Sequence, residues 1–75
     1  MTLNEAKPGD VLIVDDLSRV DKYCLRKLFD FDIYASSLIT FDDVEGNVVH
    51  YHKDEAVRRA ISLELAERIG VHPCR

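Results

Sequence analysis

The stretch SRVDKYCLRKLFDF, Ser18 to Phe31, is the one segment whose apolar residues recur with the period of an amphipathic helix. Ser18 is placed to cap the first turn, with Asp21 at the third helical position, as in a variant of the capping box. One half of the helical wheel collects Val20, Cys24, Leu25, Leu28, Phe29 and Phe31. The pattern predicts a helix over residues 18–31 that buries this half against a small sheet.

The polar half of the same predicted helix carries Lys22, Tyr23, Arg26, Lys27 and Asp30. Tyrosine and arginine are enriched at the centres of protein interfaces, so this half is where we expect a protein partner to bind. Tyr34 and Tyr51 are candidates to extend that surface. The alternative is that these tyrosines lie flat on the surface and bind nothing.

Short apolar runs before and after this helix have the length and the β-branched content of strands. They lie at residues 10–16, 37–42, 48–53 and 56–61. Ser62 is placed to cap a short helix over residues 63–69, which Gly70 stops, and Val71 adds a last short strand. The elements predict a mainly β fold in one domain, residues 1–75. Because the strands are this short, we expect them to form a small, partly open barrel, with one main helix and one short C-terminal helix.

Size and charge limit the classes of function. The chain has 75 residues and a net charge of −4. A core of this size supplies roughly 3–5 kcal/mol net, so a partner or a homodimer stays open as a further source of stability. Nucleic-acid binding needs clustered Lys and Arg, which the acidic balance argues against. No apolar run approaches the ~20 residues of a membrane helix, and no signal peptide is evident, so we expect a cytoplasmic protein without membrane insertion.

His50 and His52 are the best metal-ligand candidates. Two residues apart on a strand, their imidazoles share one face, about 6.6 Å apart along the strand. A third ligand such as Asp54, His72 or Cys74 could complete a site for one ion. The alternative is a pair of strand histidines with no ligand.

Other polar groups suggest less chemistry. Asp42, Asp43 and Glu45 indicate an acidic loop that could hold a hard cation, although it lacks the EF-hand spacing and a solvated loop is the alternative. Cys24 and Cys74 are expected to be free thiols. There is no glycine-rich phosphate loop, and no serine has a base at motif spacing, so we expect no enzymatic activity.

Three blocks resemble the ferrous iron transport protein A (FeoA) family, small cytoplasmic proteins with an SH3-like β-barrel. Leu3–Asp10 (LNEAKPGD) resembles the opening L-x-x-x-x-x-G of that family. Leu25–Ile33 (LRKLFDFDI) resembles its RRL-x-x-L-G-hydrophobic helix end, and Ala60–Val71 (AISLELAERIGV) its closing A-L-R-x-x-x-A-x-x-I-x-V. With the matching length, the resemblance covers nearly the whole chain and implies the SH3-like form of the barrel.

The chain departs from the family pattern mainly where the pattern has glycine or proline. The glycine after the helix is Asp32, the following Pro-Gly turn falls on Ala35–Ser36, and the Gly-Asp-Pro of the middle loop has only Gly46–Asn47 as a counterpart. The arginine of A-L-R is Ser62. Because glycine and proline set backbone geometry, these turns are where the fold is expected to differ.

The resemblance implies an adaptor of bacterial ferrous iron uptake that docks on the membrane iron transporter FeoB, whose cytoplasmic part carries a GTPase domain. The adaptor would then sit at the inner face of the membrane through its partner and need no cofactor. A first alternative is a metal-sensing domain that binds Fe²⁺ or another divalent transition metal weakly through His50 and His52. A second is a general interaction or dimerisation module.

Overall fold

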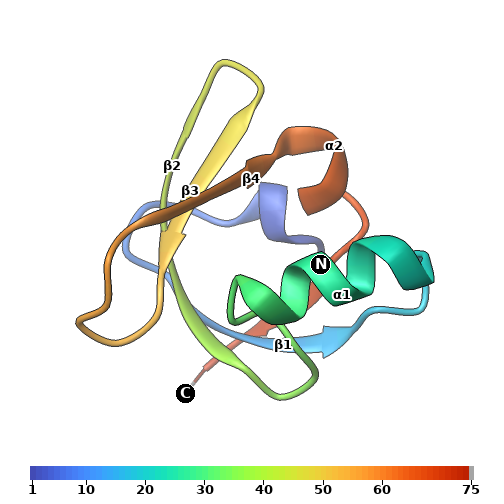
Figure 1. The fold of residues 1–75 in the computed structure, drawn as a ribbon. Coiled ribbons are helices and arrows are strands. Elements are labelled where there is room, and N and C mark those ends of the chain that lie inside the picture. The colour runs from blue at the N-terminus through green and yellow to red at the C-terminus, as the bar shows by residue number, and fades with distance from the viewer. Residues whose placement is uncertain (75) are drawn as a thin grey trace.

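Five strands form one antiparallel sheet in the order β4-β3-β2-β1-β5 (Figure 1). A computed structural model describes residues 1–74 of the chain. In chain order the elements are η1 (Leu3–Glu5), β1 (Val11–Asp16), α1 (Lys22–Asp30), β2 (Leu38–Glu45), β3 (Val48–His52), β4 (Arg59–Ser62), α2 (Leu63–Ala66) and β5 (Gly70–Pro73). The prediction of a mainly β fold with one main helix is confirmed.

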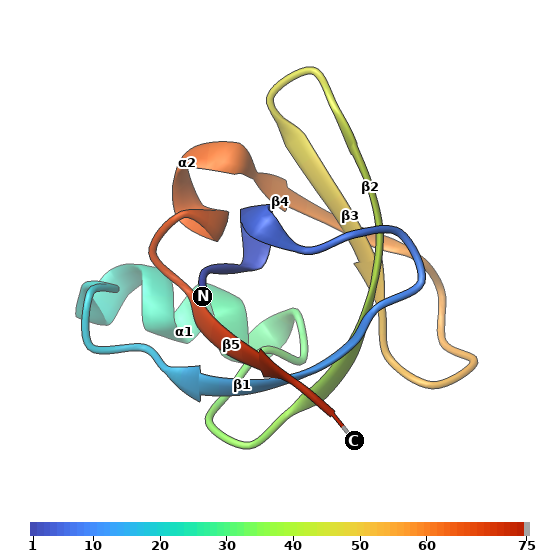
Figure 2. The ribbon, with the colours of Figure 1, turned by 180° about the vertical axis from the view of Figure 1, so that it is seen from behind.

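The sheet is open and strongly bent. β1 runs across the direction of β3 in both views, and β5 returns from the end of α2 to pair with β1 (Figures 1 and 2). Among residues 1–74, neither α1 nor α2 has both the length and the apolar composition needed to cross a bilayer.

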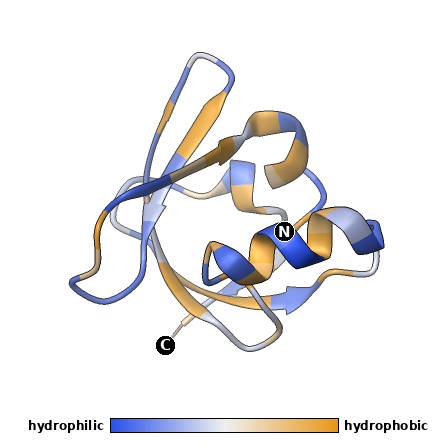
Figure 3. Ribbon diagram, viewed as in Figure 1, coloured by the Kyte–Doolittle hydropathy of each residue, from blue (hydrophilic) through white to orange (hydrophobic). Residues whose placement is uncertain are grey.

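The core follows the two-residue period of the strands. Leu12 and Val14 of β1, and Val49 and Tyr51 of β3, are buried, while the residues between them are more exposed. Further buried side chains are Leu3, Val20, Leu28, Ile33, Ile39, Phe41, Ile61, Ala66, Ile69 and Val71. The body of β1 is apolar along its length and its end is hydrophilic, as its sequence VLIVDD requires (Figure 3).

The main helix is shorter than predicted. α1 begins at Lys22, and its N-cap is Asp21, whose carboxylate accepts a hydrogen bond from the Cys24 N–H at 2.8 Å. Ser18 lies in the preceding turn, where its own N–H donates to the Asp16 carboxylate at 2.9 Å. The prediction of Ser18 as the cap was therefore wrong, because Asp21 accepts the hydrogen bond from the first turn of α1.

The predicted burial of the whole apolar half is also wrong. In α1 only Leu28 is fully buried, with Cys24 and Leu25 half-buried on either side. The side chains of Phe29 and Phe31 are 65% and 39% exposed. The small sheet covers only the stripe of the helix centred on Leu28, and Phe31 lies beyond the last helical residue.

Several strand and helix boundaries differ from those predicted. β2 extends to Glu45 because its last residues pair with β3, so the predicted acidic loop is in fact strand. β4 starts only at Arg59, after a loop in which Asp54 has a left-handed φ of 53°. Ser62 caps α2 as predicted, with its hydroxyl accepting from the Leu65 N–H, but the helix ends at Ala66.

The turn after α1 has glycine-like geometry without glycine. Asp32 and Ser36 have φ values of 65° and 72°, in the left-handed region. The buried Ser37 hydroxyl closes the turn by donating to the Asp32 carbonyl at 3.1 Å and accepting from the Tyr34 N–H at 3.0 Å. Aspartate can adopt this left-handed conformation at the end of α1 because a short polar side chain can hydrogen-bond locally.

Replacing Ser36 with glycine is expected to raise the free energy of unfolding by about 0.5–1 kcal/mol. The left-handed conformation costs a residue with a Cβ roughly 1–2 kcal/mol, and the greater freedom of glycine in the unfolded chain returns part of that gain. Urea unfolding followed by circular dichroism measures the change. Ala35→Gly is the matched control in the same turn, and it should lower stability because Ala35 has no left-handed φ to relieve. Equal losses from both variants would show that Ser36 is not strained.

Candidate functional site

A row of histidine–carboxylate pairs lies on the outer face of β2 and β3. His50 and His52 share one face of β3, as predicted, and this face points away from the core, since Val49 and Tyr51 between and beside them are buried. His50 Nδ1 lies 2.7 Å from Asp43 Oδ1, and His52 Nδ1 lies 2.9 Å and 3.0 Å from the two oxygens of Asp42. The sequence therefore predicted the histidine face, but not the carboxylates opposite.

A β-bulge makes both pairs reachable. The register between β2 and β3 shifts between Phe41 and Asp43, so Asp42 is an extra residue on β2. A bulge re-aims the side chains around it, and here two consecutive aspartates each meet a histidine of the neighbouring strand. The Gly46–Asn47 turn brings β3 back alongside β2, and Gly46 has a φ of 60° there.

The neighbours of each ring decide what its second nitrogen can do. In a neutral imidazole whose Nδ1–H donates to a carboxylate, Nε2 carries the lone pair and can accept a proton or bind a metal. The same arrangement recurs at His72, whose Nδ1 lies 2.6 Å from Asp15 Oδ2, on the β1–β5 side of the sheet. His72 therefore does not join the β2–β3 row, and neither it nor Cys74 supplies the third ligand considered for His50 and His52.

Arg58 links the two aspartates. Its Nη2 donates to Asp43 Oδ2 at 2.7 Å, and its Nε lies 4.0 Å from Asp42 Oδ2. The His50 hydrogen bond, followed by the charge of Arg58, holds the pKa of the Asp43 carboxyl below its ordinary value. Asp43 is therefore ionised at neutral pH.

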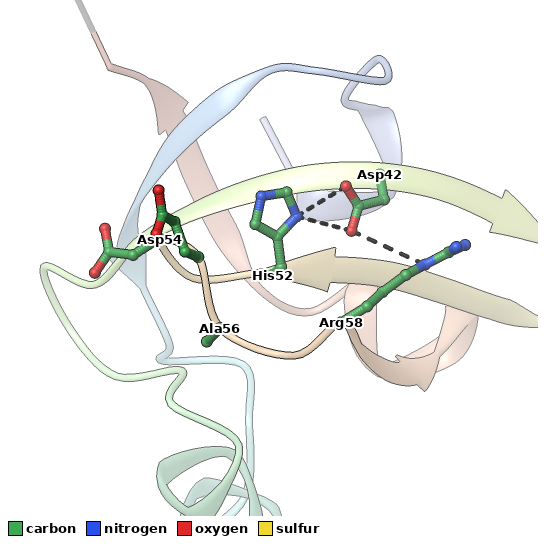
Figure 4. Close-up of a pocket in the computed structure, with 6 residues that line it drawn as sticks. Asp42, His52, Asp54, Ala56 and Arg58 are labelled. Carbon is green, nitrogen blue, oxygen red and sulfur yellow. Dashed lines mark hydrogen bonds and ion pairs between the residues drawn. The ribbon is translucent and has the colours of Figure 1, made fainter.

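The pocket beside this row is open and polar. It has a volume of about 470 Å³ and is lined by Asp42, His52, Asp54, Glu55, Ala56 and Arg58. The carboxylate of Asp42 stands between the His52 ring and the Arg58 guanidinium, while Asp54 lies on the far side of the ring (Figure 4). In residues 1–74, no third metal-ligating atom completes a cluster around His52.

One group of three potential ligands does form next to it. Asp43, Glu45 and His50 each offer a ligand atom within 4.8 Å of the others. The signal missed in the sequence was the Gly-Asn pair between two β-branched runs, which is typical of a tight hairpin and would have placed the acids opposite the histidines.

The outer face of α1 is exposed as predicted. Lys22, Tyr23, Arg26, Lys27 and Asp30 are all exposed. The Lys27 ammonium lies 4.7 Å from the centroid of the Tyr23 ring. A shallow depression of about 390 Å³ is lined by Lys22, Tyr23, Leu25 and Arg26.

A second exposed surface adjoins the exit of α1. We call it the aromatic patch, and it comprises Phe29, Phe31, Tyr34, Lys53 and Arg59. The Phe29 and Tyr34 ring centroids are 5.5 Å apart, and the Lys53 ammonium donates to the Tyr34 hydroxyl at 2.6 Å. Arg59 lies 5.9 Å from the Phe31 centroid and pairs with Asp32 at 3.4 Å. A cationic side chain thus contacts two of the three rings, Lys53 at Tyr34 and Arg59 at Phe31.

Tyr51 and Cys24 lie in or against the core. Tyr51 is fully buried, its hydroxyl donates to the Phe31 carbonyl at 2.9 Å, and burial raises its pKa to about 12. Tyr51 is therefore a core residue and cannot contact a partner. Burial, followed by Asp21, raises the pKa of the Cys24 thiol. Cys24 and Cys74 are both free thiols, as expected.

Comparison with known proteins adds no relative. The chain matches no protein-family model, no curated protein and no solved structure.

Proposed function

We propose that the chain is a docking domain that binds a protein partner through the aromatic patch and the outer face of α1. The observation that carries the proposal is the exposure of Phe29, at 65%, beside Phe31 and Tyr34, at 39% and 38%. Grouped aromatic rings left in water by a chain with so small a core are typical of an interaction surface. Rings and guanidinium groups are also the side chains that contribute most to binding energy at interfaces.

The proposed partner is the cytoplasmic part of the FeoB iron transporter. This step depends on the resemblance to the FeoA family. Two positions where that family has glycine, Asp32 and Ser36, have the left-handed φ that glycine favours, which supports the same backbone course. The bent, open five-stranded sheet is compatible with the SH3-like barrel of that family.

In this proposal the domain modulates iron transport by binding alone and catalyses no reaction. Lys22, Arg26 and Lys27 on α1, with Lys53 at the aromatic patch, present positive charge on a chain of net charge −4. This segregation suits an acidic surface on the partner, because complementary charge speeds encounter and fixes orientation. The adaptor acts at the inner face of the membrane only while bound. A homodimer through the same surface is the alternative outcome.

Replacing Phe29 with alanine is expected to weaken binding to the cytoplasmic GTPase part of FeoB by about 10-fold or more. Because the ring is mostly exposed, the free energy of unfolding should change by less than about 0.5 kcal/mol. Isothermal titration calorimetry with the purified full chain measures the affinity, and urea unfolding measures the stability.

Val44→Ala is the matched control. Val44 is also apolar and 44% exposed, but it lies near the end of β2. The β2–β3 turn that follows is away from α1 in both views (Figures 1 and 2). Replacing Val44 should leave the affinity unchanged. The FeoB assignment fails if the wild-type chain does not bind where a standard FeoA binds. Self-association that Phe29→Ala abolishes would point to the homodimer instead.

A further inference from the structure

We propose that Asp43, Glu45 and His50 form a surface site for one divalent transition-metal ion. One imidazole nitrogen and two carboxylate oxygens make a mixed ligand set that suits Zn²⁺ and similar ions better than Mg²⁺, which prefers oxygen and water. This set differs from the His50–His52 pair that strand spacing predicted. The site is independent of docking through α1.

The first two ligands lie close to the spacing that one ion requires. Asp43 and His50 are directly opposite each other on β2 and β3, and Nδ1 lies 2.7 Å from Oδ1. Ligand atoms about 2.0–2.2 Å from a tetrahedral zinc ion lie roughly 3.3–3.6 Å from each other, so these two atoms need to separate by less than about 1 Å. An ion that binds here takes the place of the proton between these two atoms, and the neutral imidazole then carries its N–H on Nε2, which leaves the Nδ1 lone pair for the metal.

Glu45 supplies the third ligand. It is two residues from Asp43 on the same strand, so the two carboxylates share one face of the sheet. Its side chain is exposed and, in the part of the chain that the structure describes, has no ion-pair partner. Its ligand atom lies within 4.8 Å of those of Asp43 and His50, so rotation of the side chain brings it to ligand spacing.

Arg58 orients the site from outside. It donates to Oδ2 of Asp43, which leaves Oδ1 directed at His50. Partners of this kind around a ligating carboxylate fix its orientation and strengthen metal binding. Asp42 and Asp43 share the one guanidinium of Arg58, and Glu45 adds a third carboxylate beside Asp43, so a cation also relieves repulsion between the carboxylates.

The test is calorimetric titration of Zn²⁺ into the purified full chain, with Mg²⁺ as the comparison. The wild type is expected to bind one Zn²⁺ and to show no Mg²⁺ binding at the same concentrations. Glu45→Gln, which keeps the shape of the side chain, should raise the Kd by about 10-fold or more. His50→Ala should abolish binding. Amide chemical-shift changes should centre on residues 43, 45 and 50.

His52→Ala is the matched control, because His52 has the same strand environment and its own aspartate, yet lies outside the three-ligand cluster. It should bind Zn²⁺ like the wild type. Equal weakening by His50→Ala and His52→Ala, or an unchanged Kd in Glu45→Gln, would overturn the ligand set. Absence of wild-type binding below about 1 mM would overturn the site itself. FeoB binding is measured separately with the same variants, so either proposal can fail alone.

Discussion

Replacing Leu28 with alanine is expected to lower the free energy of unfolding by about 2–5 kcal/mol, the usual cost of truncating a buried leucine. Leu28 is 1% exposed and is the one fully buried side chain of α1. A domain of this size has roughly 3–5 kcal/mol in total. A large part of the population should therefore be unfolded without denaturant, as circular dichroism during urea titration will show.

Phe29→Ala removes an even larger apolar side chain from the adjacent position, yet it should change the unfolding free energy by less than about 0.5 kcal/mol. The difference arises because water already reaches most of the Phe29 ring. Equal losses in the two variants would mean that Phe29 packs against the domain in solution. That result would also remove the central residue of the aromatic patch from the docking proposal.

The contrast between these neighbours shows what helical periodicity cannot predict. A helical wheel gives the angle of each side chain, and it placed Leu28 and Phe29 in one apolar half. It does not give the width of the stripe that the rest of the fold covers. Here the sheet is too small to reach Phe29, so the most informative surface residue was assigned to the core.

Strand alternation was the more reliable signal because it is local. The period of two placed Ile39 with Phe41 on one face, and Val49 with Tyr51 on the face opposite the histidines. All four are buried. Once His50 and His52 face outward, Tyr51 must face the core, so its proposed role in docking conflicted with the same pattern.

The candidate metal site could be predicted only in part. The spacing of His50 and His52 fixed their common face, but ligands from another strand depend on register. That register is set by the turn at Gly46 and by the extra residue, Asp42, in β2. The acidic run gave no sign that histidines lie opposite it, and the histidine pair gave no sign of the acids. Their meeting is a property of the hairpin.

Replacing Gly70 with alanine is expected to lower the free energy of unfolding by about 1–3 kcal/mol, as overpacking does at a site that cannot relax. A Cβ on Gly70 would lie 2.7 Å from the Cβ of Asp16 and 3.1 Å from the Asp16 carbonyl oxygen. Both atoms belong to β1, where the register with β5 shifts between Val14 and Asp16. Since main chain is involved, rotation of a side chain cannot relieve the clash. Urea unfolding measures the loss.

A double-mutant cycle with Asp16→Gly identifies the cause of that loss. Asp16→Gly alone should destabilise, because the Asp16 carboxylate no longer accepts the Ser18 N–H and the glycine gains freedom in the unfolded chain. In the Gly70→Ala background it also removes the Cβ at 2.7 Å, so the double variant should be more stable than the sum of the two single losses implies. Gly70 has no left-handed φ, so alanine incurs no conformational penalty there. Strictly additive losses would therefore exclude the contact with the Asp16 Cβ as the cause and place the cost in the contact with the Asp16 carbonyl oxygen, which Asp16→Gly leaves intact.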